Sequence, residues 1–311
     1  MTNFSSRREA ATLAFLAAIL WATYYPFVLW LSPDVDGAVL AFPFLFGGLP
    51  FLVVAARRTG GGWADALAPL RTREGLLAGV LLVAMQADVV VSTRLAGAVT
   101  TAILTLLGDV ALIPAMNLVL WNEGREQVMR PVFWGGVAVA TFGGTLSIVG
   151  GGGVTGLSGT AWLVALPLPF LVGAYFLLVA RLSRTTPTEH LVASASLLAF
   201  AIAAVGAVLL TGIGGFPGPL DSRGWVLLVV LGVTSFFLGP WFFFESARRL
   251  SVVVPAVINA TIPVFTLLFV VVLLGTTVAW VAVLGVPLAF LGGALALMGP
   301  GTRSTPSSPP T

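Results

Sequence analysis

Cysteine and lysine are missing from this 311-residue chain, and histidine occurs once, as His190. The lack of cysteine excludes disulfides, thiolate catalysis and cysteine-based metal sites. One histidine argues against a metal centre built from imidazoles, and the scattered carboxylates form no pattern typical of a catalytic centre. We therefore expect no cofactor, no bound metal and no enzymatic activity.

Charged side chains are also scarce. They make up 9% of the residues, whereas hydrophobic residues make up 58% and the mean hydropathy is +1.04. A soluble domain carries roughly 25% charged residues, so this chain cannot cover itself with polar surface in water. The composition therefore predicts an integral membrane protein whose partner is the lipid bilayer, because each spanning helix needs about 20 apolar residues.

Apolar stretches of that length follow one another along almost the whole chain. We expect an all-α integral membrane protein with ten transmembrane helices, and the stretches themselves define where each helix lies. They cover residues 10–31, 37–56, 74–93, 97–121, 131–149, 158–181, 190–211, 223–246, 252–274 and 277–299.

The arginines support an even number of helices. If successive loops alternate between the two sides, thirteen arginines lie on one side and only Arg94 and Arg223 lie on the other. The positive-inside rule then places both termini in the cytoplasm, which requires an even helix count. We expect a multi-pass protein of the cell (inner) membrane. Because the arginines follow this rule, the pI near 10.2 does not point to a nucleic-acid partner.

Short patterns recur between the two halves of the chain in the same order. Because five helices is an odd number, a repeat of five enters the membrane from the opposite side, which gives two inverted-topology five-helix repeats, a common plan of secondary transporters. The recurring groups are Gly136, Ala140 and Gly144 with Gly285, Ala289 and Gly293; Tyr24 and Leu31-Ser32 with Tyr175 and Leu182-Ser183; and Arg94-Leu95 with Arg249-Leu250.

The predicted organisation has four parts. They are a cytoplasmic N-terminus over residues 1–9, a first five-helix repeat over 10–150, a second over 158–299 and a disordered cytoplasmic tail over 300–311. Residues 151–156 satisfy a GxGxxG pattern, but a dinucleotide site needs a strand before it and a βαβ frame. We interpret this glycine-rich segment as a flexible loop between two membrane helices.

Ionisable side chains inside apolar helices are the main candidates for a binding site. Asp109 lies near the middle of the expected fourth helix, with Thr105 one turn before it. An unpaired charge there costs at least several kcal/mol, so the side chain faces a cavity, has a partner or holds a proton. We expect a substrate or proton site at Asp109; the alternative is a structural hydrogen bond to another helix.

Two further carboxylates are candidates for proton coupling, and each has a simpler interpretation. Asp88 and Gln86 lie on opposite sides of one helix, and we favour Gln86 as the residue that faces the cavity. Glu245 precedes Arg249 by four residues, which favours an ion pair on one helix face. The alternative for Glu245 is a path-lining role together with Trp241.

The remaining candidates are aromatic, amide and proline residues at mid-helix positions. Trp21, Tyr24, Tyr175 and Asn259 are expected to line a cavity, with core packing as the alternative for the aromatic ones. Prolines inside helices remove a backbone donor and kink the helix, and broken helices border the binding sites of transporters. The hinge candidates are Pro26, Pro240, Pro255 and Pro263.

Several segments resemble the drug/metabolite transporter superfamily, in its EamA-type branch. Residues 20–23 (Leu-Trp-Ala-Thr) are similar to the start of the first repeat, and residues 173–175 (Gly-Ala-Tyr) to the start of the second. Residues 255–265 are similar to a helix-nine segment that ends in Pro-Val, and residues 273–275 to a Leu-Gly-Glu turn, with Thr276 in place of the glutamate. The resemblance implies one central cavity lined mainly by helices one, three, four, six, eight and nine.

The predicted function is secondary transport of a small organic solute by alternating access. We favour export of amino acids or similar apolar metabolites. Drug or multidrug export and sugar-phosphate or nucleotide-sugar exchange are alternatives, and phosphorylated substrates are less favoured because no basic residue lies mid-span. Alternatives of another class are a channel, a multispan enzyme and a non-transporting membrane protein. The sequence leaves the oligomeric state open.

Overall fold

The computed structural model describes residues 2–59, 62–121, 128–150, 159–212, 216–250, 253–277 and 279–297. Within these ranges the chain is all-helical, without a β-strand. Seven of its helical segments are long and apolar enough to cross a membrane. They are Arg8–Trp30, Pro33–Arg58, Arg73–Ala96, Ala98–Leu120, Leu163–Leu182, Thr188–Thr211 and Ser222–Arg249.

The expected stretches at 252–274 and 277–299 form shorter apolar helices, Asn259–Leu274 and Trp280–Leu295. The count of ten and the inverted repeat therefore stay predictions. The predicted loop over residues 151–156 and the predicted tail over 300–311 lie outside the described residues.

Several spans consist of more than one helix. The first contains α1 (Thr2–Ala22) and α2 (Tyr24–Trp30), and the stretch from 98 to 121 contains α6 (Ala98–Leu107), a π-helical segment η3 (Gly108–Leu112) and α7 (Ile113–Trp121). The other interrupted stretches are α10 (Gly159–Ala165) with α11 (Leu168–Leu182); α13 (Ser222–Leu231) with the π-helical η4 (Gly232–Leu238) and α14 (Gly239–Leu250); and α15 (Val253–Ile258) with the 3₁₀ turn η5 (Asn259–Thr261) and α16 (Ile262–Leu274).

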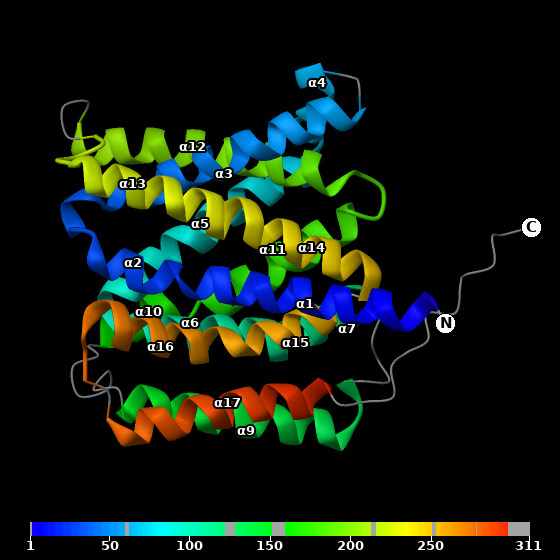
Figure 1. Ribbon diagram of the computed structural model, residues 1–311, viewed down its shortest axis with the longest axis vertical. Helices are drawn as coiled ribbons and strands as arrows, with labels where there is room; N and C mark the ends of the chain where they lie inside the picture. Colours follow the sequence, from blue (N-terminus) through cyan, green and yellow to red (C-terminus); the bar gives the residue numbers. More distant parts are fainter. Residues whose placement is uncertain are drawn as a thin grey trace, which may run out of the picture.

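The remaining long helices are continuous. They are α3 (Asp36–Thr59), α5 (Arg73–Ala96), α9 (Pro131–Gly150), α12 (Thr188–Thr211) and α17 (Trp280–Leu297). Short turns complete the described chain: η1 (Pro33–Val35), α4 (Gly62–Ala66) and η2 (Ala68–Arg71). Figure 1 shows the long helices lying roughly side by side, with α9 and α17 paired at one edge of the bundle.

Prolines account for the π-helical segments η3 and η4, because a proline lacks the backbone N–H that a helix uses. In η4 the Gly239 N–H donates to Thr234, five residues back, and the next residue is Pro240. In η3 the Ile113 N–H likewise donates to Gly108, and the next residue is Pro114. The chain thus changes to π-helical bonding immediately before each of these two prolines.

The two ends of the bundle are held by ion pairs between helices. At one end Arg58 of α3 binds Glu189 of α12 at 3.3 Å, and Arg249 of α14 binds Glu9 of α1 at 3.5 Å. At the other end Arg94, in the last turn of α5, binds Asp36, in the first turn of α3, at 2.7 Å. Arg94 and Asp36 also each complement the dipole of their own helix, because Arg94 lies at a helix C-terminus and Asp36 at a helix N-terminus.

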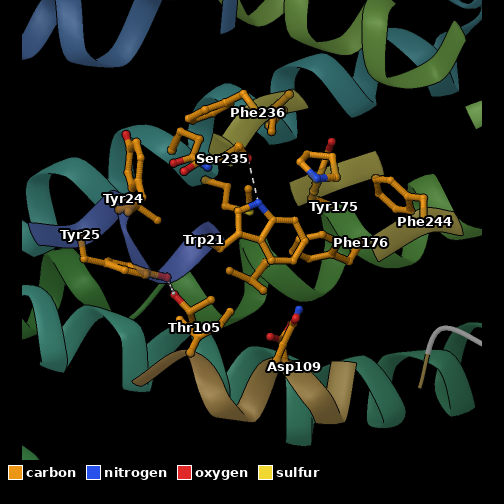
Figure 2. Close-up of a pocket in the computed structure, with 18 residues that line it drawn as sticks. Trp21, Tyr24, Tyr25, Thr105, Asp109, Tyr175, Phe176, Ser235, Phe236 and Phe244 are labelled. Atoms are coloured by element: carbon orange, nitrogen blue, oxygen red, sulfur yellow. Dashed lines mark hydrogen bonds between the residues drawn. The ribbon is translucent and has the colours of Figure 1, made fainter. Parts of the chain in front are cut away.

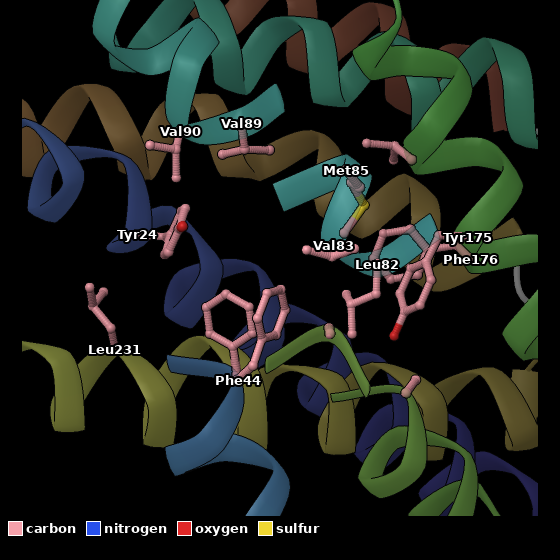
Figure 3. Packing of buried hydrophobic residues seen from close by; sticks show 14 of the residues in the cluster. Tyr24, Phe44, Leu82, Val83, Met85, Val89, Val90, Tyr175, Phe176 and Leu231 are labelled. Carbon is pink, nitrogen blue, oxygen red and sulfur yellow. The ribbon is translucent and has the colours of Figure 1, made fainter. Parts of the chain in front are cut away.

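The interior between these ends is apolar and contains several aromatic rings among Ala, Val and Leu side chains. Figure 3 shows side chains from α2, α3, α5 and α11 converging, and they belong to one buried cluster: Tyr24, Phe44, Leu82, Met85 and Phe176. Tightly packed aromatic rings hold the surrounding backbones in place because protein interiors have few voids. The cavity described below is therefore an exception inside a dense core.

Candidate functional site

One cavity lies inside the bundle among the broken helices. It offers about 60 Å³ to the centres of water-sized molecules, which is room for roughly four to six waters. Its lining comes from α1, α2, α5, α6, η3, α11, η4, α14, η5 and α16, which belong to the first, third, fourth, sixth, eighth and ninth expected helices. The lining residues are Trp21, Tyr24, Tyr25, Leu82, Met85, Gln86, Val89, Thr105, Asp109, Val172, Tyr175, Phe176, Ser235, Phe236, Pro240, Phe244, Asn259 and Ile262.

Most of the predicted cavity residues come together here. Seven of the eight line this one space: Trp21, Tyr24, Gln86, Thr105, Asp109, Tyr175 and Asn259. Trp241 does not; its ring stacks on Phe51 at 5.7 Å between centroids, and the guanidinium of Arg58 lies over it at 5.2 Å. Trp241 therefore packs between α14 and α3, away from the cavity.

The three carboxylates that were candidates for proton coupling lie in different surroundings. Asp109 lines the cavity, whereas Asp88 is half-exposed and accepts a hydrogen bond of 2.7 Å from Ser92. Glu245 accepts two hydrogen bonds from Arg249, at 2.7 and 3.0 Å, so the expected ion pair along one helix is present. Of the three, Asp109 alone faces the interior space.

Trp21 occupies the middle of the cavity lining, where it joins two broken helices. Its indole N–H donates to the Ser235 carbonyl at 2.8 Å, and the Ser235 hydroxyl donates to the Leu20 carbonyl at 3.3 Å. Residue 240 is a proline, and the Gly239 N–H is already bonded to Thr234. The Ser235 carbonyl therefore has no donor from positions four or five ahead in its own helix, and Trp21 satisfies it (Figure 2).

Replacing Trp21 with Phe is expected to destabilise the protein by about 1–3 kcal/mol. The change removes the indole donor from the buried Ser235 carbonyl, and a buried unsatisfied acceptor costs about that much. Trp63→Phe is the matched control, because Trp63 is 56% exposed. Thermal unfolding in detergent checks the difference, and equal midpoints for the two variants would contradict the proposed role of the indole N–H.

Pro26 and Pro263 shape the lining in the same way. Pro26 cannot donate to the Ala22 carbonyl, and the hydroxyl of Thr266 reaches that carbonyl at 3.5 Å from α16. Pro263 cannot donate to the Asn259 carbonyl, so the Ile262 N–H donates to it instead and the backbone tightens into the 3₁₀ turn. Pro240 itself lines the cavity, and Pro255 lies buried in α15.

Pro114 is a determinant that the sequence reasoning did not single out. The Ile113 N–H donates to Gly108, and residue 114 has no N–H. The backbone carbonyl of Asp109 therefore lacks a donor from positions four or five ahead, just as that of Ser235 does. A proline five residues after a polar residue is the sequence signal that both sites share.

The polar side chains of the cavity differ in whether they are satisfied. Tyr25 donates to the Thr105 hydroxyl at 3.1 Å, and Thr105 donates to the Thr101 carbonyl at 3.0 Å. Asp109 and Asn259 are each only 1% exposed, and neither side chain has a hydrogen-bond partner among the described residues. Asn259 is the polar group that interacts with Asp109, although no hydrogen bond of regular geometry joins the two side chains.

Figure 2 shows how these side chains surround Trp21, with Thr105 and Asp109 on one side of the indole and Ser235 and Phe236 on the other. The lining residues that the sequence reasoning missed are mostly apolar or aromatic. They include Tyr25, Phe176, Ser235, Phe236 and Phe244. In a chain with 21 Phe and 9 Trp, residue type alone does not separate a cavity-lining ring from a core ring.

Comparison with known protein families finds one match, in the second half of the chain. Residues 159–298 match the model of the EamA-like transporter family, so the chain carries an EamA-like transporter domain, and the resemblance to the drug/metabolite transporter superfamily is confirmed. No curated protein matches the chain.

Solved structures share the fold over most of the chain, and 26 solved chains match it. One, described as a crystal structure of a protein, has a TM-score of 0.65 and 19% sequence identity. The match covers 93% of this chain and 98% of the other. At that identity the likeness establishes the fold alone.

Proposed function

We propose that this EamA-type membrane protein is a secondary transporter that carries small organic solutes through its central cavity by alternating access. The observation that supports this most is the pair of buried, unpartnered polar side chains, Asp109 and Asn259, in one cavity. Asp109 comes from the first half of the chain, and Asn259 comes from the EamA-like domain. Burying such groups without partners costs free energy that a bound solute recovers.

The proposed architecture is two inverted five-helix repeats, ten spans in all, with both termini in the cytoplasm of an inner-membrane protein. The start of α1 and the end of α17 lie at the same end of the bundle (Figure 1), which agrees with an even number of crossings. Arg57, Arg58, Arg248 and Arg249 end α3 and α14. An arginine-rich end of this kind belongs on the cytoplasmic side.

The proposed substrates are amino acids or similar apolar metabolites, and the proposed direction is export. Most of the cavity lining is apolar or aromatic, and no arginine, lysine or histidine belongs to it. Sugar phosphates need cationic side chains to replace their hydration, so this lining disfavours phosphorylated solutes. The small free space favours solutes of a few heavy atoms.

Filling the cavity is expected to stop transport. Val89 is 4% exposed and lines the cavity, whereas Val91 lies two residues further along the same helix and is 42% exposed. Val89→Trp places a large ring in the free space, and Val91→Trp places the same ring on the outer surface. In proteoliposomes loaded with unlabelled amino acids and amines, we expect counterflow of the labelled solutes to fall to background for Val89→Trp only.

Counterflow also separates a carrier from a channel, since only a carrier accumulates label transiently against its gradient. Equal rates for Val89→Trp and the wild type would contradict a transport path through this cavity. Steady single-channel conductance without counterflow would contradict alternating access.

A further inference from the structure

The unpartnered atoms around the cavity are mostly hydrogen-bond acceptors. They include both carboxylate oxygens of Asp109, the amide oxygen of Asn259 and the amide oxygen of Gln86. The unpartnered donors are the Asn259 amide nitrogen and the Tyr24 hydroxyl, which also accepts. A ligand that completes this set is therefore rich in donors, and an ammonium group, with three N–H donors and no acceptor, fits that requirement.

The charge of the cavity lining also favours a cationic ligand. Asp109 is the only carboxyl among the lining residues, and none of them is Arg or His. Arginines elsewhere already have acidic partners, as in Arg94 with Asp36 and Arg58 with Glu189. A carboxylate buried without a counter-charge is strongly disfavoured, so the positive charge that balances Asp109 comes from a bound cation or from a proton.

The aromatic lining accommodates a cation as well as an apolar body. Ring faces attract ammonium groups, and the attraction is largest for desolvated sites. Figure 2 shows the indole of Trp21 above Asp109, with the rings of Tyr175 and Phe176 beside it. A carboxylate on the solute, by contrast, meets no cationic side chain in this lining, and it loses its hydration without replacement.

We propose that the cavity selects small organic cations, namely primary amines with an apolar body, with Asp109 as their counter-ion, and that it discriminates against zwitterions and anions. This inference rests on the proposed transport function, and within its class of small organic solutes it replaces amino acids with amines as the preferred substrates. Asn259 and Gln86 accept hydrogen bonds from those ammonium N–H groups that do not bond to Asp109.

The same geometry makes a proton and an amine compete for Asp109. The elements packed against η3 are α6, α7, α11, α15 and η5, and their ionisable side chains are Tyr175, which lines the cavity, and Arg181, which is exposed at the end of α11. Tyr25 of α2 is the other titratable group near Asp109. Neither tyrosine carries charge near neutral pH, so Asp109 alone makes amine affinity fall as the pH is lowered.

A matched ligand series tests the proposal on the purified full-length chain. The ligands are isoamylamine, isoamyl alcohol, 4-methylpentanoate and leucine, which share a branched apolar body and differ in charge. By calorimetry we expect isoamylamine to bind at least about tenfold more tightly than any of the others, since hydrogen bonds to a charged group are worth about that factor. Lowering the pH should weaken amine binding and leave alcohol binding unchanged.

Asp109→Asn should lower the affinity for isoamylamine at least about tenfold and leave the affinity for isoamyl alcohol within about twofold. Asp65→Asn is the charge-matched control, because Asp65 lies exposed outside the cavity. The alcohol shows that the variant cavity is intact, so a folding defect is not mistaken for a lost counter-ion.

The outcomes separate this proposal from the transport function on which it rests. Leucine that binds as tightly as isoamylamine, or an amine that does not bind at all, overturns the amine selectivity. If leucine shows counterflow that Val89→Trp abolishes while isoamylamine shows none, the proposed transport function is supported and the amine selectivity is wrong. If neither solute shows counterflow above protein-free vesicles, the transport function fails as well.

Discussion

Asp109→Asn is expected to remove the coupling between solute movement and proton movement. Asp109 is the only carboxyl that lines the cavity among the described residues, and asparagine keeps its shape without taking up a proton. The lost interaction between carboxylate and cation is about 2 kcal/mol, which corresponds to about a thirtyfold lower rate of coupled exchange. The protein-dependent signal in the variant should then approach background.

The measurement uses proteoliposomes that contain a trapped pH indicator. Isoamylamine is added outside without a pH gradient, and the change in lumenal pH is followed; protein-free vesicles provide the baseline, because amines also cross lipid as free bases. Leucine is the second solute, so that coupling is examined whichever solute the protein carries. The expected result is a protein-dependent pH change in the wild type and almost none in Asp109→Asn.

The two other carboxylate candidates provide the discriminating controls. Asp88→Asn and Glu245→Gln should retain the pH change, because Asp88 accepts from Ser92 and Glu245 is bound by Arg249, both outside the cavity. A pH change that disappears in Asp88→Asn and persists in Asp109→Asn would place the coupling site on the other face of α5.

The polar part of the site could be predicted from the sequence because few polar residues occur within the apolar stretches. Asp109, Asn259 and Gln86 each interrupt a long apolar run, and the cost of burying them directs them toward a cavity. The 100° step of an α-helix placed Gln86 and Asp88 on opposite faces, and the lower cost of burying a neutral amide favoured Gln86 as the cavity residue. The separation of the two faces agrees with the structure because α5 is continuous from Arg73 to Ala96.

The placement of Trp241 failed for the opposite reason. Its assignment to a path-lining role assumed a regular helix across 223–246. The chain instead changes to π-helical bonding over Gly232–Leu238, and each extra residue in a turn rotates the following face by about 100°. Ser235 and Phe236 therefore face the cavity, and Trp241 faces α3.

Prolines could be located from the sequence, but their consequences depend on neighbouring helices. The freed Ser235 carbonyl becomes part of the site because Trp21 reaches it from a residue 214 positions away. No feature of the sequence near Pro240 indicates that Trp21 is the donor to this carbonyl. The breaks near Pro240 and Pro263 thus lie at prolines that the sequence shows, whereas the contacts that make these breaks part of a cavity are long-range and were not predicted.

Replacing Gly292 with Ala is expected to destabilise the protein by about 3 kcal/mol or more. Gly292 of α17 lies directly against Ala140 of α9, so a Cβ there collides with the backbone of Ala140 and with the Gly136 carbonyl at 2.6 Å. Backbone atoms cannot move aside as a flexible side chain can, and overpacking of this kind costs about 1–3 kcal/mol or more. Gly143 and Gly285 make similar close contacts, so the two helices approach through glycines on both sides.

Gly135→Ala supplies the matched control, because a Cβ at that position of α9 meets nothing within 4 Å. Its effect should be neutral or stabilising by up to about 1 kcal/mol, since alanine favours the helix more than glycine does. Thermal unfolding in detergent should therefore separate the two variants by roughly 5–10 °C. Equal midpoints would show that α9 and α17 do not depend on this contact.

The same substitution is expected to impair the site from a distance. Gly293, next to Gly292, faces Ala260 of η5 and Val110 of η3, where a Cβ would meet their side chains at 2.9 and 3.3 Å. These two segments carry Asn259 and Asp109. A displacement of α17 therefore shifts both unpartnered polar groups, and counterflow should fall in Gly292→Ala even at temperatures where the variant is fully folded, while Gly135→Ala keeps the wild-type rate.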